Sequence, residues 1–388
     1  MCIRDSRYGR PLPLWQAFPI LERMGVQVQD ERPYRIEPDD SAPLWVHDFG
    51  LSYAVPEASD TSEVRSLFQD AFARIWQGAM EDDGFNALAL NARLNWRQIT
   101  LLRAYARYLR QTALTFSQEY MQEALVGNPA IARMLVELFE ARFDPQRPKQ
   151  VEQKTAALTA RLSESLDAVQ SLDHDRILRS FLAMVQASLR SNYYQTDAEG
   201  QPKACLALKL DPKKVPGLPE PRPMFEIFVY SPRTEGVHLR GGKVARGGIR
   251  WSDRREDFRT EILGLMKAQL VKNVVIVPVG AKGGFVVKRP PASGERSEVR
   301  ADVEACYRLF ISGLLDLTDN LRDGECVPPP QSVRYDGDDP DLVVAADKGT
   351  ATFSDLANGV AADYGFWLGD AFASGGRAGY DHKKMGIT

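Results

Sequence analysis

Four ionisable side chains stand out because of the residues that surround them: Arg246, Lys272, Lys282 and Asp347. A guanidinium can hold a carboxylate through two parallel hydrogen bonds, and a lysine close to other cations can work as an acid or a base. A dicarboxylic amino acid needs two cationic anchors, which Arg246 and Lys272 could provide. Lys282 and Asp347 would then exchange protons with the bound molecule. The set therefore predicts a site for proton transfer on a dicarboxylate.

Glycines surround two of these side chains. The motif ARGGIR at 245–250 lets the backbone bend tightly and leaves Arg246 free, although by itself it is more typical of a surface turn. The motif GAKGG at 280–284 follows an apolar run that predicts a buried strand, and loops at the carboxyl ends of such strands bind ligands in open α/β sheets. Gly280 and Gly283 would let a substrate approach closely, so we assign both to substrate binding.

The other two side chains have ordinary alternatives. Lys272 ends a predicted amphipathic helix, where a lysine often complements the helix dipole. Asp347 follows an apolar strand and could cap the helix predicted to begin near Phe353, a role that Thr350 or Ser354 could fill equally well. Each residue alone is ambiguous, and only their order and their placement at strand ends indicate a site.

Several common sites are not indicated. The sequence has no GxGxxG fingerprint for a dinucleotide and no GxxxxGK[ST] phosphate loop. The four cysteines form no CxxC pair, and the four histidines are scattered without the spacing of a zinc motif. We expect reduced thiols and no metal.

Strands alternate with helices after residue 191, which predicts an α/β domain with a mixed or parallel sheet that positions the site. The predicted strands are 204–210, 225–230, 274–279 and 342–346, and the predicted helices are 257–272 and 297–317. We read 231–256 as rich in turns and 322–341 as a polar, acidic loop.

Two further regions precede this domain. Residues 11–53 predict a small α/β piece with a helix at 14–24 and strands at 26–30 and 44–53, and Pro33 and Pro38 are expected to break the stretch between the strands. Apolar residues at helical spacing predict a helical region over 61–190, with helices at 61–76, 99–125, 130–143, 151–172 and 176–191.

Composition narrows the class of protein. The 388 residues carry a formal net charge of -3, which gives no overall attraction to nucleic acid or anionic membrane. The basic stretch at 233–272 is interleaved with acidic residues, which favours salt-bridged faces over nucleic-acid binding. No apolar run is long enough to span a bilayer, and residues 1–10 contain no signal region. We expect a cytoplasmic protein.

The long passages 225–289, 343–358 and 364–388, which contain ARGGIR, GAKGG and ADKGT, resemble the large NAD-dependent glutamate dehydrogenases of bacteria. The resemblance extends from about residue 11 to the end of the chain. It implies an oxidoreductase of amino-acid catabolism that converts L-glutamate to 2-oxoglutarate and ammonia, with NAD as cofactor. The subunits of that family are several times longer than this chain.

The resemblance also implies roles for single residues. Lys282 corresponds to the catalytic lysine that promotes attack of water on the imine carbon, and Asp347 to the aspartate that shuttles protons. Lys272 corresponds to a lysine that holds a substrate carboxylate. Arg246 stands where smaller glutamate dehydrogenases have lysine, a departure that keeps the charge and changes the geometry. Thr388 matches a threonine close to the nicotinamide.

The resemblance suggests a division of the chain. Residues 1–6 look like translated adaptor sequence, and we leave them out of the fold. We expect the C-terminal part of an ACT-like regulatory domain over 7–60, a helical segment over 61–190, the catalytic substrate-binding domain over 191–375, and over 376–388 the start of a connection to an NAD-binding domain. We expect an incomplete chain, truncated at both ends, that is inactive by itself and belongs to a homo-oligomer.

An alternative class remains open. Because no dinucleotide motif is present, the chain could instead be a non-catalytic module that binds glutamate or 2-oxoglutarate.

Overall fold

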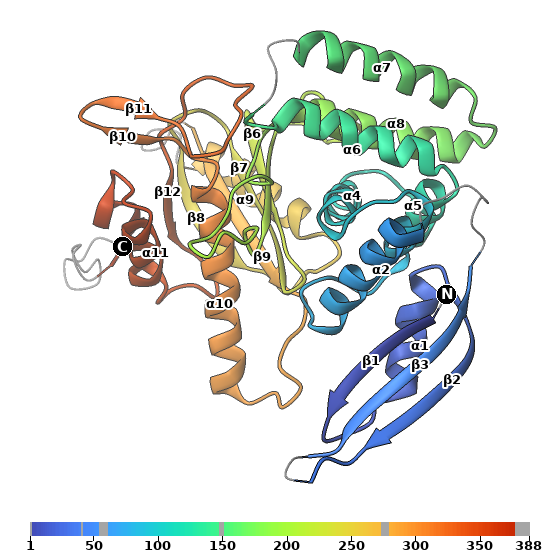
Figure 1. Cartoon of the computed structure of the whole chain (residues 1–388). Helices are drawn as coiled ribbons and strands as arrows, with labels where there is room; N and C mark the ends of the chain where they lie inside the picture. Colours follow the sequence, from blue (N-terminus) through green and yellow to red (C-terminus); the bar gives the residue numbers. More distant parts are fainter. Residues whose placement is uncertain (1, 40–41, 54–60, 147–150, 273–278, 377–388) are drawn as a thin grey trace. The chain divides into compact units, whose positions relative to one another are not determined.

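The computed structural model describes residues 2–39, 42–53, 61–146, 151–272 and 279–376 (Figure 1). The chain forms two compact units. The first contains Met1–Arg103, Ser117–Val136 and Glu164–Leu178, and the second contains Ala104–Phe116, Glu137–Ser163 and Arg179–Thr388. The second unit therefore carries Arg246, Lys282 and Asp347.

The first unit begins with a three-stranded antiparallel sheet in the order β1-β3-β2 and a helix, α1 (Leu14–Arg23) (Figure 1). Its strands are β1 (Cys2–Tyr8), β2 (Gln27–Ile36) and β3 (Leu44–Ser52). The segment that we left out of the fold thus contributes residues to β1, which pairs with β3 along its whole length.

Strand β2 is longer than predicted and runs through Pro33, which we expected to break it. Proline is tolerated there because β2 is an edge strand, so that the missing N–H costs no bond to a second neighbour. His47 on β3 ties the sheet to the segment before α1, because its Nε2 accepts a hydrogen bond of 2.9 Å from the backbone N–H of Leu12.

Helices follow the small sheet, as predicted. They are α2 (Thr61–Trp76), η1 (Gly84–Ala87), α3 (Leu88–Asn91), α4 (Trp96–Leu109), α5 (Gln118–Val126), α6 (Pro129–Phe143), α7 (Val151–Asp167) and α8 (Leu172–Ala187). The single helix predicted over 99–125 is wrong, because α4 and α5 are separate. The hydroxyl of Thr112 bonds the carbonyl of Leu109 at 2.6 Å, and Ser117 caps the new helix by accepting from the backbone N–H of Tyr120.

An eight-stranded sheet dominates the second unit, in the order β13-β12-β8-β9-β7-β6-β5-β4. Its strands are β4 (Ser188–Ser191), β5 (Leu206–Leu210), β6 (Phe225–Tyr230), β7 (Thr234–Arg240), β8 (Arg246–Trp251), β9 (Ala281–Val287), β12 (Val343–Ala346) and β13 (Ala373–Ser374). The first four strands of that order are parallel, and the pairs from β9 to β4 are antiparallel. The predicted mixed sheet is confirmed.

Helices cover the two faces of this sheet. On one face, α10 (Arg296–Leu315) and α11 (Ser354–Asp363) complete the main apolar core with Phe285 of β9. Side chains alternate between faces along a strand, so the next residue, Gly284, faces the other way, towards Ile262 of α9 (Phe258–Lys272). The sheet thus has an α10 face and an α9 face.

The stretch that we read as rich in turns, 231–256, contains strands β7 and β8. Its glycines mark close packing. A Cβ atom on Gly236 would lie 2.5 Å from the ring of Phe310, and one on Gly247 would lie 1.4 Å from the carbonyl oxygen of Ala281. Neighbouring elements approach so closely that only glycine fits in the strand.

Three smaller expectations differ from the structure. Residues 188–191 form β4, where we predicted helix, because β4 pairs with β5. The acidic loop 322–341 includes part of a hairpin of β10 (Asn320–Arg322) and β11 (Glu325–Val327). Most of the strand predicted over 274–279 lies outside the described residues.

Candidate active site

Lys282 and Asp347, 65 residues apart in the sequence, meet on the parallel part of the sheet. Lys282 is the second residue of β9, and Asp347 directly follows β12. The Nζ atom of Lys282 donates to Oδ2 of Asp347 at 2.9 Å. Their side chains are 19% and 13% exposed, so both can be reached from solvent. We expected Lys282 in a loop after a strand; instead it lies at the beginning of one, which fixes its direction.

Arg250 of β8 is the third member of the cluster. Its Nε and Nη2 atoms donate to Oδ1 of Asp347 at 3.2 and 3.0 Å. The backbone N–H of Lys348 adds a bond of 2.6 Å to the same oxygen. Both oxygens of Asp347 therefore accept hydrogen bonds from cationic side chains, Oδ1 from Arg250 on β8 and Oδ2 from Lys282 on β9.

The surroundings of Asp347 hold it in its charged form. Burial alone would raise its pKa, but the hydrogen bonds from Lys282, from the backbone N–H of Lys348 and from Arg250 outweigh burial and lower the pKa. Asp347 is thus a carboxylate at neutral pH.

Arg246 shares the face of Lys282. It begins β8, its backbone bridges to Gly280, and the parallel register sets Arg250 opposite Gly284. Strand alternation then places Arg246, Arg250 and Lys282 on the α9 face. Arg246 is exposed, and its carbonyl oxygen accepts a hydrogen bond of 2.8 Å from Gln269 of α9.

The remaining predicted site residues are placed less fully. Lys272 is the last residue of α9, and its side chain lies outside the described part of the structure. Thr388 also lies outside the described residues. Gly283 has a packing reason of its own, since an added Cβ would lie 2.5 Å from Cδ1 of Ile249 and 3.0 Å from His238. The substrate-binding roles of Gly280 and Gly283 stay predictions.

Buried contacts hold α9 against the sheet. Arg259 of α9 donates from Nε to Oε2 of Glu226 on β6 at 2.9 Å, and Tyr108 of α4 donates to the same oxygen at 2.6 Å. Burial opposes the charge on Arg259, yet Glu226 more than compensates and raises its pKa. The helix that ends at Lys272 is therefore fixed near its beginning.

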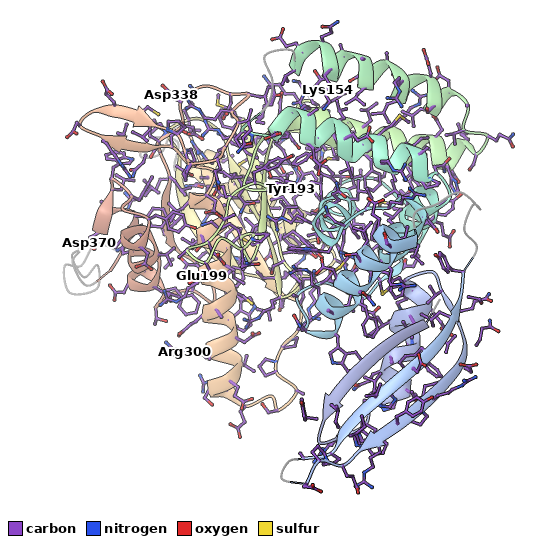
Figure 2. The ribbon with its side chains drawn as sticks, in the orientation of Figure 1. Lys154, Tyr193, Glu199, Arg300, Asp338 and Asp370 are labelled. Carbon is purple, nitrogen blue, oxygen red and sulfur yellow. The ribbon has the colours of Figure 1, made fainter. Side chains whose placement is uncertain are left out.

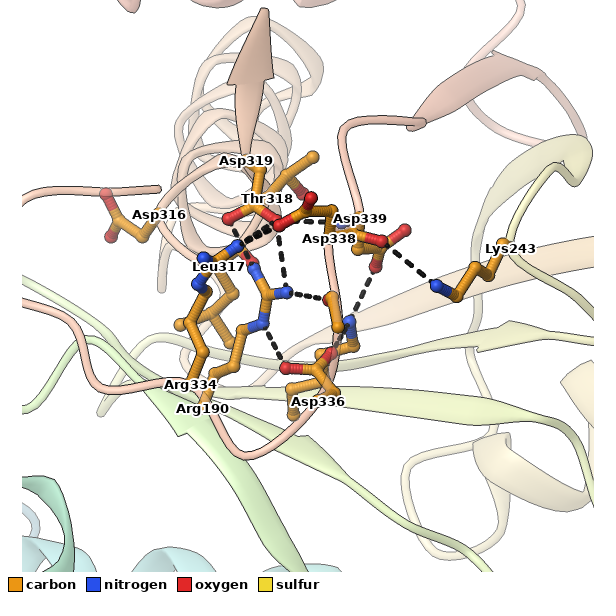
Figure 3. A network of polar contacts seen from close by, with 12 residues as sticks. Arg190, Lys243, Asp316, Leu317, Thr318, Asp319, Arg334, Asp336, Asp338 and Asp339 are labelled. Atoms are coloured by element: carbon orange, nitrogen blue, oxygen red, sulfur yellow. Dashed lines mark hydrogen bonds and ion pairs between the residues drawn. The ribbon is translucent and has the colours of Figure 1, made fainter. Parts of the chain in front are cut away.

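The α10 face carries a second set of charges, which we call the buried charge network (Figure 3). It joins three cations from β4, β5 and β7 to three aspartates that follow α10. Its members are Arg190, Lys209, Arg240, Asp319, Asp336 and Asp339. All six side chains are at most 6% exposed. No sequence pattern predicted this network.

One group of possible metal ligands borders the network. Ligand atoms of Asp319, Cys326 and Asp338 lie within 4.8 Å of one another. Both oxygens of Asp319 already accept hydrogen bonds from guanidinium groups, of Arg190 and of Arg334 (Figure 3). Because arginines occupy these ligand positions, we assign no metal to them, and the expected absence of a metal stays a prediction.

Comparison with known proteins identifies the family. Residues 161–388 match the family described as bacterial NAD-glutamate dehydrogenase, catalytic domain. The chain belongs to the bacterial NAD-glutamate dehydrogenases. Residues 80–145 match glutamate dehydrogenase helical motif 3, and residues 6–64 match the glutamate dehydrogenase ACT3 domain. The predicted order of ACT-like, helical and catalytic regions is confirmed, while our domain boundaries stay predictions.

Close relatives support the family. The chain is 58% identical over 381 residues to the NAD-specific glutamate dehydrogenase of Pseudomonas aeruginosa, and 97% of the chain is covered. It is 55% identical to that of Halomonas elongata and 54% identical to that of Mycobacterium tuberculosis, each over 98% of the chain. The chain covers 23–24% of the length of these NAD-glutamate dehydrogenases, about a quarter.

Sequence reasoning missed Arg250 and its partner on α9, Glu261. Arg250 stands in the motif ARGGIR, four residues after Arg246. Once this motif is recognised as a strand, period-two alternation places both arginines on one face. We had read the motif as a turn, which hid that relation.

In the part of the chain that the structure describes, no helix combines the length and the apolar character needed to cross a membrane.

Proposed function

We propose that the complete protein containing this chain oxidises L-glutamate to 2-oxoglutarate and ammonia and reduces NAD. The observation that carries the proposal is the contact of 2.9 Å between Lys282 and Asp347 on a partly exposed sheet face. A lysine and a carboxylate in direct contact can pass a proton between them. The family and the relatives, which are glutamate dehydrogenases, supply the substrate.

The side chains of this face divide the work. Arg246, exposed on the same face, would hold one substrate carboxylate, and Lys272 at the end of α9 would hold the other. Lys282 would donate a proton as water adds to the imine carbon of the oxidised substrate. Asp347 would take the proton that the attacking water releases and return it to Lys282.

The residues of this chain suit the substrate better than the dinucleotide. The described face offers cations for carboxylates, and the sequence has no GxGxxG turn for a pyrophosphate. Bound NAD would accept the hydride of the substrate α-carbon. We assign NAD to residues beyond this chain, and Thr388 stays a predicted neighbour of the nicotinamide.

The test is formation of NADH from L-glutamate by the full-length protein. We expect steady turnover, and we expect none from the 388-residue chain by itself. Arg246→Met should raise KM for glutamate more than it lowers kcat, because a carboxylate anchor acts in substrate binding. If the full-length protein binds 2-oxoglutarate in calorimetry but forms no NADH from L-glutamate, the non-catalytic module would be favoured instead.

Two further properties belong to this proposal. We propose a cytoplasmic homo-oligomer, on the basis of composition and of the family. Light scattering on the full-length protein would measure the oligomeric state, and a monomeric mass would remove that part of the proposal.

A further inference from the structure

Arg250 lies between two carboxylates that belong to different elements. On one side its Nε and Nη2 atoms bond Oδ1 of Asp347, which follows β12. On the other side its Nη1 atom donates to Oε1 of Glu261 on α9 at 2.9 Å. All the donor atoms of the guanidinium group are thus directed at the two acids. The side chain is 20% exposed, beside acids that are 13% and 16% exposed.

Glu261 is itself held in place. Its second oxygen, Oε2, accepts a hydrogen bond of 2.6 Å from the hydroxyl of Ser252, two residues after Arg250 on the chain. The backbone N–H of Ser252 donates to the carbonyl of Phe285 at 2.9 Å, which fixes that residue against β9. Glu261 therefore presents Oε1 to Arg250 in one direction only.

The geometry assigns Arg250 as a positioning residue for the Lys282–Asp347 pair, with Glu261 as the group that aims Arg250. This inference rests on the proposed function. Arg250 occupies Oδ1 of Asp347 from the β8 side, which leaves Oδ2 directed at Lys282 on β9. Two donors of one rigid guanidinium converge on Oδ1 and fix the position of that oxygen more firmly than a single ammonium donor would.

The charged groups around Asp347 determine what removal of Arg250 does. Lys282 faces it from β9 and Arg250 from β8, and Glu261 of α9 reaches it only through Arg250. Arg246 lies on the same sheet face at the beginning of β8, four residues before Arg250. Without Arg250, Asp347 loses a cation and two of the four hydrogen bonds that its carboxylate accepts. Its pKa should then rise, because Arg250 is one of the groups that lower it.

Kinetics of the full-length protein test the inference. We expect Arg250→Met to lower kcat by up to about a hundredfold with little change in KM, because the reacting pair is misplaced while the carboxylate anchors remain. The acidic limb of the pH profile of kcat should move to higher pH. Arg250→Lys should recover part of the rate, and Glu261→Gln should show a smaller loss with the same direction of shift.

Arg254→Met is the matched control. Arg254 lies four residues after Arg250, and its guanidinium group is bound to the exposed carboxylate of Asp257 and makes no direct contact with Asp347 among the described residues. It should leave kcat and the pH profile unchanged. An Arg250→Met enzyme with the wild-type pH profile, or a loss confined to KM, would overturn the inference.

A second measurement separates this inference from the proposed function. A double-mutant cycle between Arg250→Met and Asp347→Asn, followed by unfolding of the 388-residue chain at several pH values, reports their coupling without any turnover. Coupling that weakens as Asp347 is protonated supports the positioning role even if glutamate proves to be the wrong substrate. Absence of coupling at every pH would contradict it even in an active enzyme.

Discussion

Two sets of arginine, lysine and aspartate side chains lie on opposite faces of one sheet. The buried charge network occupies the α10 face, because Arg240 pairs in register with Ala281 of β9, and Ala281 lies on the same side of β9 as Phe285. The cluster of Arg250, Lys282 and Asp347 occupies the α9 face, and Lys282 is the very next residue after Ala281. Arginine, lysine and aspartate thus occur in a buried environment on one face and in a partly exposed environment on the other. Consecutive residues of β9 border the two environments.

Exposure distinguishes the two sets. In the network, Arg190 and Asp319 are fully buried, and their charges are balanced by each other and by neighbouring groups. On the α9 face, the side chains of the cluster are 13–20% exposed and can be reached from solvent. The comparison teaches that ion pairs closed off from water support the fold, whereas the pair that remains open can support chemistry.

Removal of Arg190 should have the largest effect on stability. Arg190→Met leaves the carboxylates of Asp319 and Asp336 buried without that partner, and loss of one member of a buried pair costs about 3–5 kcal/mol. Chemical denaturation of the 388-residue chain would measure the free energy of unfolding.

The matched control for Arg190 is an exposed ion pair of the same type. Arg300 on the surface of α10 pairs with Glu304, and its side chain is 63% exposed (Figure 2). Arg300→Met should change the free energy of unfolding by no more than about 0.5 kcal/mol. Similar losses for Arg190→Met and Arg300→Met would contradict the distinction between buried and open pairs.

Gly283 directly follows Lys282 in β9. Replacement of Gly283 should have an intermediate effect on the free energy of unfolding. In Gly283→Ala, the added methyl group would collide with Ile249 and His238 on the α10 face, and overpacking of this kind costs about 1–3 kcal/mol. Thermal unfolding would detect the loss. Gly359→Ala in α11 is the control, because an added methyl group would meet open space there. This variant should gain about 0.5–1 kcal/mol in the free energy of unfolding. A neutral Gly283→Ala variant would show that close packing does not explain this glycine.

The smallest effect on stability should come from Asp347, and it should depend on pH. Its pKa is lowered in the folded chain, so its contribution is fully present above the pKa of the unfolded chain, about 3.9. The contribution is lost as the pH falls through the lower folded value. The difference in unfolding free energy between wild type and Asp347→Asn should therefore stay constant from pH 7 to about pH 5 and shrink in more acidic solution. A difference that grows towards acid pH would have the wrong sign.

Much of the site could be predicted from the sequence. Lys282 in GAKGG and Asp347 in ADKGT belong to glycine-containing motifs that follow apolar runs, and the structure brings the two side chains into contact. Arg250 was missed because ARGGIR has the composition of a turn. Its glycines serve instead the close approach of the two neighbouring strands, Gly247 that of β9 and Gly248 that of the end of β12 with Asp347, which only the tertiary structure reveals.

The buried charge network could not be predicted for a different reason. Arg190 and Lys209 stand on separate strands, and Asp319, Asp336 and Asp339 come more than 100 residues later. Nothing local marks any of them as buried, because charged residues are usually exposed. The mixed sheet, in contrast, followed from the alternation of strands and helices, which is a local signal.

Turnover of Lys282→Ala in the full-length protein tests most directly whether the open pair on the α9 face performs the reaction. NADH formation from L-glutamate should fall by about a hundredfold or more, the range expected for loss of a positioned acid–base group, while the unfolding midpoint stays close to that of wild type. Lys214→Ala, at an exposed lysine before β6, should keep full activity. A Lys282→Ala enzyme that forms NADH at a near-normal rate would contradict the assignment of the reaction to this pair.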